Sequence, residues 1–346
     1  MKLTEYYFLT QLFPRVGPRT VIKLLEEWSS IDAVFEQLQK KHRLNQNQIK
    51  QHLSAINEGI QRHQLSVIFW HDDEYPQAFR NLSDPPLFFF YKGTLPQLRE
   101  RTVAIVGTRN PSAYGQTITQ KITAQLVNQG VVIASGFMRG IDTQAHRTVL
   151  DHEGRTIGVL GSGFNYIVPP ENKKLVNEVI KKGALISEFI PDQQPTKYTF
   201  PQRNRLVAAL SEVVIVIEAG PKSGALITAR LAGEQGKTVA AVPGSIFSVK
   251  SAGANWLIGQ GATVISTIDG VGELLGFSTG NPSKEQPVFV NKIQKNIFER
   301  LSQNPASCDD LVRSLQVSTQ VILSEISIME LTGLVKKFDE NSYMVD

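Results

Sequence analysis

The sequence predicts an α/β protein whose largest part is a doubly wound, mostly parallel sheet between residues 66 and 276. Two observations carry this prediction. Short β-branched runs alternate with helical segments, which is the pattern of right-handed βαβ units. One run, VVIVI at 213–217, is apolar throughout, as is typical of a strand buried on both faces of a parallel sheet.

Composition sets the limits of the interpretation. The chain has 346 residues, of which 41% are hydrophobic, enough for two or three domains. The formal net charge of +4 permits a nucleic-acid partner without requiring one. A single cysteine, Cys308, excludes an internal disulfide framework and fits a reducing compartment. We find no signal-peptide pattern and no apolar run of about 18 residues, so we expect a cytoplasmic protein with no membrane contact.

Residues 1–65 predict a small all-helical domain. Apolar residues have helical spacing around residues 6–13, 21–28, 31–38 and 48–61. Gly17 and Pro18, followed by Arg19, resemble the turn of a helix-hairpin-helix, in which backbone N–H groups contact phosphate. A protein-interaction module and a plain packing unit remain open as alternatives.

The middle domain, residues 66–276, is expected to contain nine strands with helices in most of the intervals. The strands are predicted at residues 66–70, 87–91, 103–106, 131–134, 156–160, 184–187, 213–217, 238–242 and 263–266. A polar linker follows at 277–287. Residues 288–346 then predict a winged-helix-like domain, with helices at 291–301, 308–315 and 319–331 and a two-stranded wing. Its presumed recognition helix carries Glu325 and Glu330 but no Arg or Lys, which favours protein contact or weak duplex binding.

Small, hydroxyl-bearing and basic residues follow the predicted strands. In a doubly wound sheet, ligands bind outside the carboxyl ends of the strands, so these residues should meet at one edge. Glycines let a ligand approach the backbone, and N–H groups with arginines make an anion site. The residues are Gly107, Thr108 and Arg109 after the first core strand, Ser135, Gly136, Arg139 and Gly140 after the second, Gly161, Ser162 and Gly163 after the third, Gly220, Lys222, Ser223 and Gly224 after 213–217, and Pro243, Gly244 and Ser245 after the next.

The segment KYTFPQRNRLVAAL at 197–210 leads into the strand at 213–217. It is expected to start as a polar loop that carries Arg203, Asn204 and Arg205, and to become a short helix at 206–210. A core strand does not need this cluster beside it, so the cluster predicts an anionic ligand. The alternative is an ordinary solvated loop with two arginines.

Other chemistries find little support. Tyr166 stands at the sixth position of the glycine pattern that begins at Gly161, which argues against a dinucleotide fingerprint. Gly236-Lys237-Thr238 runs from helix to strand, the reverse of an ATP-binding P-loop. We expect no metal and no cofactor. Glu218, at a strand end, is a candidate for acid–base chemistry, with a structural carboxylate as the alternative.

Seven motifs occur in an order that resembles one family. They are VGTR at 106–109, SGFMRGID at 135–142, GSGFNYIVP at 161–169, FPQRNRLVAALS at 200–211, VIEAGPKSGALITA at 216–229, AVPGS at 241–245 and GANWLI at 253–258. Together they resemble the DNA-processing protein A family, also called DprA or Smf. The resemblance implies a Rossmann-like core that binds and protects single-stranded DNA and helps to load the RecA recombinase in natural transformation. It also implies a homodimer through that domain and no catalytic turnover.

Phosphate contacts and base stacking are the means by which such a protein would hold a single strand. Phe200 could instead be a hydrophobic anchor for its loop. We expect that charge removal at Arg109 or Arg203 weakens DNA binding without unfolding the protein. The candidate DNA-binding residues are Arg109, Ser135, Arg139, Lys197, Tyr198, Phe200, Arg203, Asn204, Arg205 and Ser223.

Two other functions compete with this reading. Rossmann-like enzymes that hydrolyse nucleoside monophosphates would make Glu218 catalytic, but their PGGxGT motif is replaced here by GPKSGALIT at 220–228. A protein scaffold would use the basic segment to contact an acidic patch on a partner.

Overall fold

The computed structural model describes residues 7–8, 12–13, 16–42, 45–97, 99–277, 289–302, 304–332, 334–338 and 342–345. The chain forms two compact units, Met1–Ser278 and Thr279–Asp346, and each is described by itself. The boundary predicted at residue 65 therefore lies inside the first unit. The linker predicted at 277–287 lies almost entirely outside the described residues.

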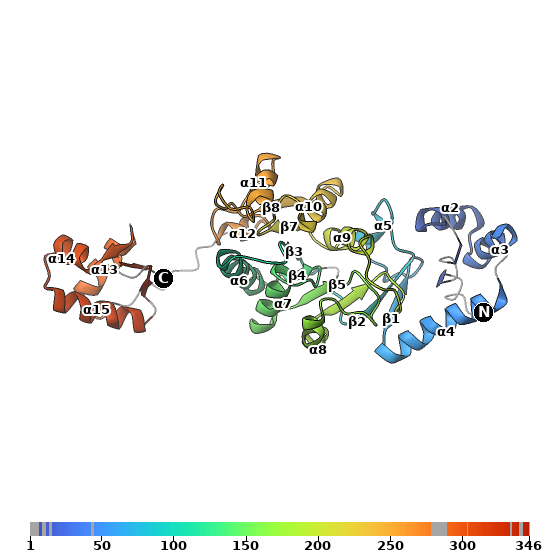
Figure 1. Ribbon diagram of the computed structural model, residues 1–346, viewed down its shortest axis with the longest axis horizontal. Helices are drawn as coiled ribbons and strands as arrows, with labels where there is room; N and C mark the ends of the chain where they lie inside the picture. The colour runs from blue at the N-terminus through green and yellow to red at the C-terminus, as the bar shows by residue number, and fades with distance from the viewer. Residues whose placement is uncertain are drawn as a thin grey trace. The chain divides into compact units, whose positions relative to one another are not determined.

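One mostly parallel sheet forms the centre of the first unit (Figure 1), and it confirms the predicted fold class. Within the described residues its order is β1-β2-β6-β5-β4-β3-β7-β8-β9, and β2 alone runs opposite to the common direction of the other strands. The strands are β1 Ser66–Phe69, β2 Phe88–Gly93, β3 Thr102–Val106, β4 Val132–Ser135, β5 Thr156–Val159, β6 Ala184–Ser187, β7 Val213–Val216, β8 Thr238–Ala241 and β9 Thr263–Val264.

Helices cover both faces of the sheet. Figure 1 shows α6, α7 and α8 on one side of the strands and α9, α10 and α11 on the other. Alternate residues of β3 feed the two cores: Ala104 packs in the cluster with α9 and α10, and Ile105 packs in the cluster with α6 and α7. The helices around the sheet are α5 Gln77–Arg80, α6 Ala113–Asn128, α7 Ile141–Asp151, α8 Lys173–Lys182, α9 Thr199–Ala209, α10 Gly224–Glu234, α11 Ala252–Gly259 and α12 Gly270–Glu273, with a 3-10 turn at Pro170–Asn172.

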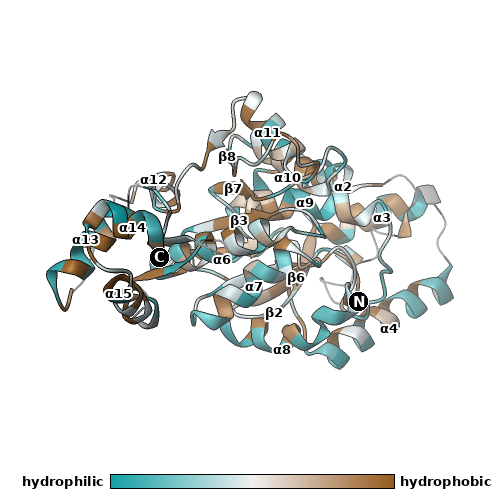
Figure 2. Cartoon of the chain, turned by 60° about the vertical axis from the view of Figure 1, so that its left-hand side comes forward, coloured by the Kyte–Doolittle hydropathy of each residue, from teal (hydrophilic) through white to brown (hydrophobic). Residues whose placement is uncertain are grey.

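The hydropathy of the elements follows their position. Strands β3 and β7 lie in the middle and are coloured hydrophobic, whereas α4 and α8 carry long hydrophilic stretches (Figure 2). This is the distribution expected when strands are covered on both faces and helices on one.

The prediction of a polar loop at 197–205 was wrong, because helix α9 begins at Thr199. Pro201 lies in the first turn of the helix, where its missing N–H would have no partner in any case. Arg203 and Arg205 are therefore on a buried helix rather than in a solvated loop. The polar sequence did not reveal this, since the partners of these side chains come from distant segments.

The N-terminal helices share a core with the sheet. They are α2 Pro18–Trp28, α3 Ile31–His42 and α4 Gln46–His63, and residues from each of them cluster with β1 and β2. A capping box begins α4: the Asn45 side chain accepts from the backbone N–H of Gln48, and the Gln48 side chain accepts from Asn45 N at 3.4 Å. Much of the helix predicted at 6–13 lies outside the described residues.

The second unit has the predicted winged-helix arrangement. Its elements are α13 Lys292–Leu301, β10 Ala306–Ser307, α14 Cys308–Leu315, α15 Thr319–Leu331, β11 Val335–Lys337 and β12 Ser342–Val345, with the strands in the order β10-β12-β11. Glu325 of α15 accepts hydrogen bonds from Asn291 and Gln294, each at 2.8 Å. This carboxylate therefore joins α15 to the start of α13.

Candidate nucleic-acid interface

A pocket of about 910 Å³ opens at the carboxyl ends of β3, β4 and β7. The chain goes from β3 to β4 on one side, and β7 pairs with β3 on the other, so this is the point where the strand order reverses. Such a switch point is where doubly wound sheets bind ligands. The segments after these strands, which include Arg109, Gly136 and Ser223, line the pocket as the sequence predicted.

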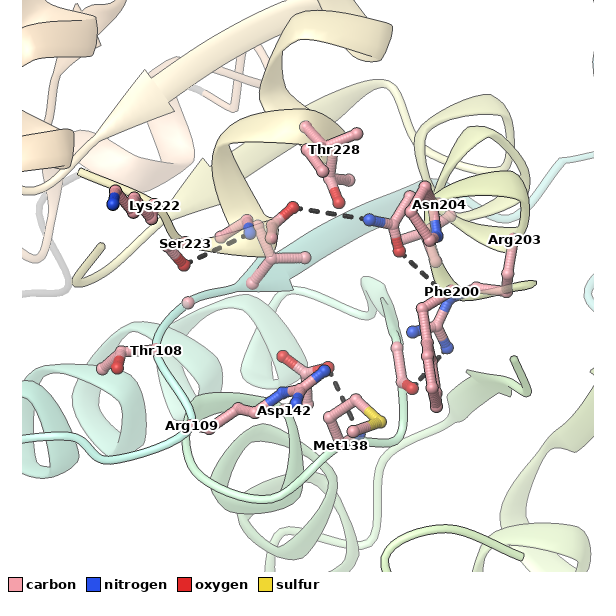
Figure 3. Close-up of a pocket in the computed structure, with 18 of the residues that line it drawn as sticks. Thr108, Arg109, Met138, Asp142, Phe200, Arg203, Asn204, Lys222, Ser223 and Thr228 are labelled. Carbon is pink, nitrogen blue, oxygen red and sulfur yellow. Dashed lines mark hydrogen bonds between the residues drawn. The ribbon is translucent and has the colours of Figure 1, made fainter. Parts of the chain in front are cut away.

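The N-terminus of α10 forms one wall of the pocket. The side chain of Ser223 accepts from Ala225 N at 3.3 Å and so caps the helix. Across the pocket, Asn204 Nδ2 donates to the carbonyl of Gly224 at 3.4 Å and joins α9 to α10 (Figure 3). The helix dipole makes this wall suitable for an anion.

Three exposed cations surround the pocket: Arg109, Lys197 and Lys222. None of the three has an acidic partner among the ion pairs of the described residues. Lys222 follows the strand predicted at 213–217 and is not among the DNA-binding residues predicted from the sequence. Its place between Pro221 and Ser223, at a strand-to-helix turn, was the signal for including it.

The Phe200 ring packs against the protein on one side and faces the pocket on the other. A Cβ atom at Gly161 would lie 2.5 Å from the ring of Phe200, so the ring packs directly on that glycine. On the pocket side, the guanidinium of Arg109 lies 5.7 Å from the centre of the ring. Tyr198 is 71% exposed, and Lys197 Nζ lies 5.1 Å from its ring. Phe200 is thus paired with a cation in the pocket, and Tyr198 is paired with a cation beside it.

Arg203 is enclosed beneath the pocket and is only 3% exposed. Its Nη1 donates to the carbonyl oxygens of Gly136 and Val159, and its Nε donates to Asn204 Oδ1 at 3.2 Å. A Cβ atom at Gly136 would lie 2.7 Å from both Arg203 Nη2 and Asp142 Oδ2, so the two charged groups flank that glycine. Arg203 therefore holds the ends of β4 and β5 together.

Asp142 is the acidic residue in the lining of the pocket, among the residues described there. Burial raises the pKa of Asp142 to about 6, although Arg203 and the N–H of Met138 favour the charged form. Burial likewise lowers the pKa of Arg203 to about 10. The charge of Arg203 is thus matched by a carboxylate within the protein. Asp142 also interacts electrostatically with Arg109, but Arg109 is exposed and forms no ion pair within the described residues.

Arg205 faces away from the pocket and makes a paired contact with Glu188. Its two terminal nitrogens lie 2.6 and 2.7 Å from the carboxylate oxygens, and both side chains are buried. Arg205 Nε also donates to the carbonyl of Asp84 at 3.0 Å. Arg205 therefore links α9 to the segments that contain Glu188 and Asp84.

The remaining candidates divide between pocket and surroundings. Ser135 is fully buried and donates to the carbonyl of Ile105 at 2.6 Å. Arg139 is exposed, but neither it nor Tyr198 belongs to the lining of the pocket. The candidates that do line it are Arg109, Lys197, Phe200, Arg203, Asn204 and Ser223.

Glu218 is occupied by the start of α6. It is 2% exposed, and its carboxylate accepts from Ser112 N at 2.9 Å and from Ser112 Oγ at 2.6 Å. Ser112 in turn caps α6 through Gly115 N. Glu218 is absent from the lining of the pocket, and the geometry is that of the structural carboxylate named as the alternative.

Neither a metal site nor a membrane span is found among the described residues. No group of three His, Cys, Asp or Glu side chains there could hold a metal ion. No helix in the same ranges combines the length and apolarity needed to cross a bilayer.

These features define a Rossmann-like α/β protein with a pocket bordered by exposed cations at its switch point and an appended winged helix. The family model described as DNA recombination-mediator protein A matches residues 66–276, and the DprA winged helix domain matches 282–338. The chain therefore belongs to the DprA family.

Individual relatives agree with this assignment. DNA processing protein DprA of Bacillus subtilis (strain 168) is 43% identical over 203 residues, which are 58% of this chain and 68% of the relative. Protein Smf of Escherichia coli (strain K12) is 41% identical over 270 residues, covering 75% and 72%.

Solved structures agree as well. The X-ray structure of DprA from Streptococcus pneumoniae has a TM-score of 0.67 at 32% identity and covers 78% of this chain and 98% of that one. A structure of DprA from Helicobacter pylori, whose subject is its single-stranded DNA binding mode, has a TM-score of 0.55 at 34% identity and covers 62% and 96%.

Proposed function

We propose that this protein is a recombination mediator that binds single-stranded DNA without sequence preference in the pocket at the switch point. The observation that carries the proposal is the set of exposed cations without acidic partners among the described ion pairs, Arg109, Lys197 and Lys222, beside the start of α10. Phosphates would lie against these groups, and bases would stack on Phe200 and Tyr198. The single-stranded DNA binding of the Helicobacter pylori relative supports the same reading.

The proposal assigns different tasks to the basic residues. Arg109, Lys197 and Lys222 contact phosphate, whereas Arg203 and Arg205, which are buried and hydrogen-bonded within the protein, position the pocket walls. DNA contact by Ser135, Arg139, Asn204 and Ser223 stays a prediction. For Arg203, the earlier expectation of an intact fold after charge removal does not fit its burial.

Salt-dependent binding is the experiment that tests this function. Fluorescence anisotropy with a labelled oligo-dT would be recorded over a range of salt concentrations. Three phosphate contacts predict a slope of log K against log salt of about −2 for a single strand. Arg109→Ala should weaken binding and reduce the size of the slope by about 0.7.

Lys121→Ala is the matched control, because Lys121 is an exposed cation on α6 outside the pocket. It should leave both affinity and slope near the wild-type values. Duplex DNA of the same length should bind more weakly than the single strand. Equal binding of duplex, or an Arg109→Ala isotherm that overlays the wild type, would contradict the proposed site.

The proposal includes the absence of catalytic turnover. Glu218 supports this part, because its carboxylate is buried against Ser112 and lies outside the pocket. No free base should be released from nucleoside monophosphates by the wild-type protein. Base release that Glu218→Gln abolishes would instead support the nucleotide hydrolase.

RecA loading and a homodimer through the Rossmann-like domain are also part of the proposal, and both follow from the family resemblance. RecA filament assembly on a single strand should be faster in the presence of the protein. Light scattering after size-exclusion chromatography should give twice the mass of the 38.4 kDa chain. A monomer mass at all concentrations would contradict the dimer.

A further inference from the structure

The loop that joins β8 to α11 ends in an exposed apolar tip. Ile246 is 84% exposed, Phe247 is 92% exposed and Val249 is 74% exposed. They are the three most exposed of the large hydrophobic residues at the carboxyl edge of the sheet that carries the pocket. A group of apolar side chains held out in this way indicates a contact surface.

Hydrogen bonds anchor the base of this loop. The side chain of Asn255 accepts from Gly244 N at 3.1 Å and donates to Gly244 O at 2.9 Å. Ser245 accepts from Phe247 N at 3.2 Å through its hydroxyl and from Ser248 N at 3.0 Å through its carbonyl. Phe247 is therefore exposed on a hydrogen-bonded turn with a defined backbone conformation.

The loop continues the rim of the pocket. Gly253 N donates to the carbonyl of Ala219 at 2.7 Å, and a Cβ atom at Gly220 would lie 3.6 Å from Val249 O. Residues 219–220 lead directly to Lys222 and Ser223 in the pocket wall. On the other side, Tyr114 Oη donates to the carbonyl of Pro243 at 3.0 Å, which attaches the loop to the first turn of α6.

The charges beside the tip have the same sign as those of the pocket. Lys250 lies at the end of the loop and Lys222 at the neighbouring rim, and both are exposed. Neither takes part in an ion pair of the described residues. An aromatic face next to free cations is the combination that holds single-stranded nucleic acid.

We propose that the loop 245–250 is a second contact site for single-stranded nucleic acid, in which a base leaving the pocket stacks on Phe247 and its phosphate meets Lys222 or Lys250. The inference rests on the proposed function of the pocket. It predicts that the bound strand passes from Arg109 and Phe200, across the start of α10, to this loop.

Strand length separates the two sites in the test. Oligo-dT of about 4 nucleotides, the short end of single-strand site sizes, would occupy the pocket, and oligo-dT of about 16 nucleotides would reach the loop. Phe247→Ala should weaken binding of the longer strand by roughly 5- to 150-fold, the effect of losing one stacked base, and leave the shorter strand unchanged. Phe247→Leu should weaken it similarly, since leucine is apolar but has no π-face, and Phe247→Trp should restore it.

Each contrary result has a distinct meaning. If Phe247→Ala binds both lengths like the wild type, or if Phe247→Leu retains full affinity, stacking at the loop is overturned. If Phe247→Ala converts a dimer to a monomer in light scattering, the occupant is a second copy of the chain and the inference fails. If Arg109→Ala leaves both lengths unaffected, the proposed function of the pocket fails first, which the Phe247 variants alone would not show.

Discussion

The Arg203→Met variant is expected to be less stable than the wild type, and not only to bind DNA more weakly. The substitution keeps the length and apolar character of the side-chain stem but removes the guanidinium. That group lies 3% exposed under the pocket and donates to the carbonyls of Gly136 and Val159. It also faces Asp142 across Gly136.

The size of the effect follows from these contacts. Removing the guanidinium takes a nearby positive charge away from the buried Asp142 carboxylate, although the two groups form no ion pair. Two buried carbonyls lose a charged donor in the same substitution, at about 1–3 kcal/mol for each unsatisfied group. Protonation of Asp142, whose pKa is already raised to about 6, relieves part of this cost. The two carbonyls alone give a range of about 2–6 kcal/mol, and we expect a loss of about 3–5 kcal/mol in the free energy of unfolding.

Thermal unfolding measures this loss. For the unit that contains the sheet, 3–5 kcal/mol corresponds to a fall in Tm of about 6–20 °C. Arg109→Met is the matched control, since Arg109 is exposed at the same pocket and its removal should change stability by less than about 0.5 kcal/mol. An Arg203→Met protein with the Tm of the wild type would refute the assignment of Arg203 as a structural group.

Three other predictions follow from buried groups near the site. Burial, with Arg203 nearby, lowers the pKa of His146 from 6.5 to about 3. The stability that the neutral imidazole contributes is therefore complete above pH 6.5 and is lost as pH falls toward 3. In urea titrations over this range, the free energy of unfolding of the wild type should fall by about 1.4 kcal/mol per pH unit relative to that of His146→Gln. Gly161→Ala places a methyl group 2.5 Å from the Phe200 ring, so anisotropy should show weaker binding of oligo-dT with near-normal secondary structure by circular dichroism. Glu218→Gln loses a charged acceptor at the start of α6 and should lower the free energy of unfolding by about 1–3 kcal/mol in urea, while the salt slope of DNA binding stays unchanged.

Local patterns were sufficient for most of the fold. β-Branched runs bounded by glycine located the strands of the parallel sheet to within one or two residues, because strands buried on both faces need continuous apolar sequence. The winged helix was equally readable, since its apolar periodicity changes from helical to strand spacing between Leu331 and Val335.

The segment around Arg203 shows where local patterns fail. Proline and a run of polar residues indicated a loop, whereas the chain forms the buried helix α9 there. The partners that make burial of these side chains favourable are Glu188 for Arg205 and the carbonyls of Gly136 and Val159 for Arg203. All three lie on other segments, and no spacing rule within α9 encodes them.

The sequence by itself determined the α/β class, the edge of the sheet where a ligand would bind and the residue types available there, because strand periodicity and the direction of parallel strands are local properties. Only the tertiary structure decided which arginines are free. Arg109 and Arg203 look alike in sequence, yet one guanidinium is exposed beside Phe200 and the other is hydrogen-bonded to carbonyls and lies near the Asp142 carboxylate. The physical reason is that a buried charge requires partners, and those partners are brought together only when strands distant in sequence pair in one sheet.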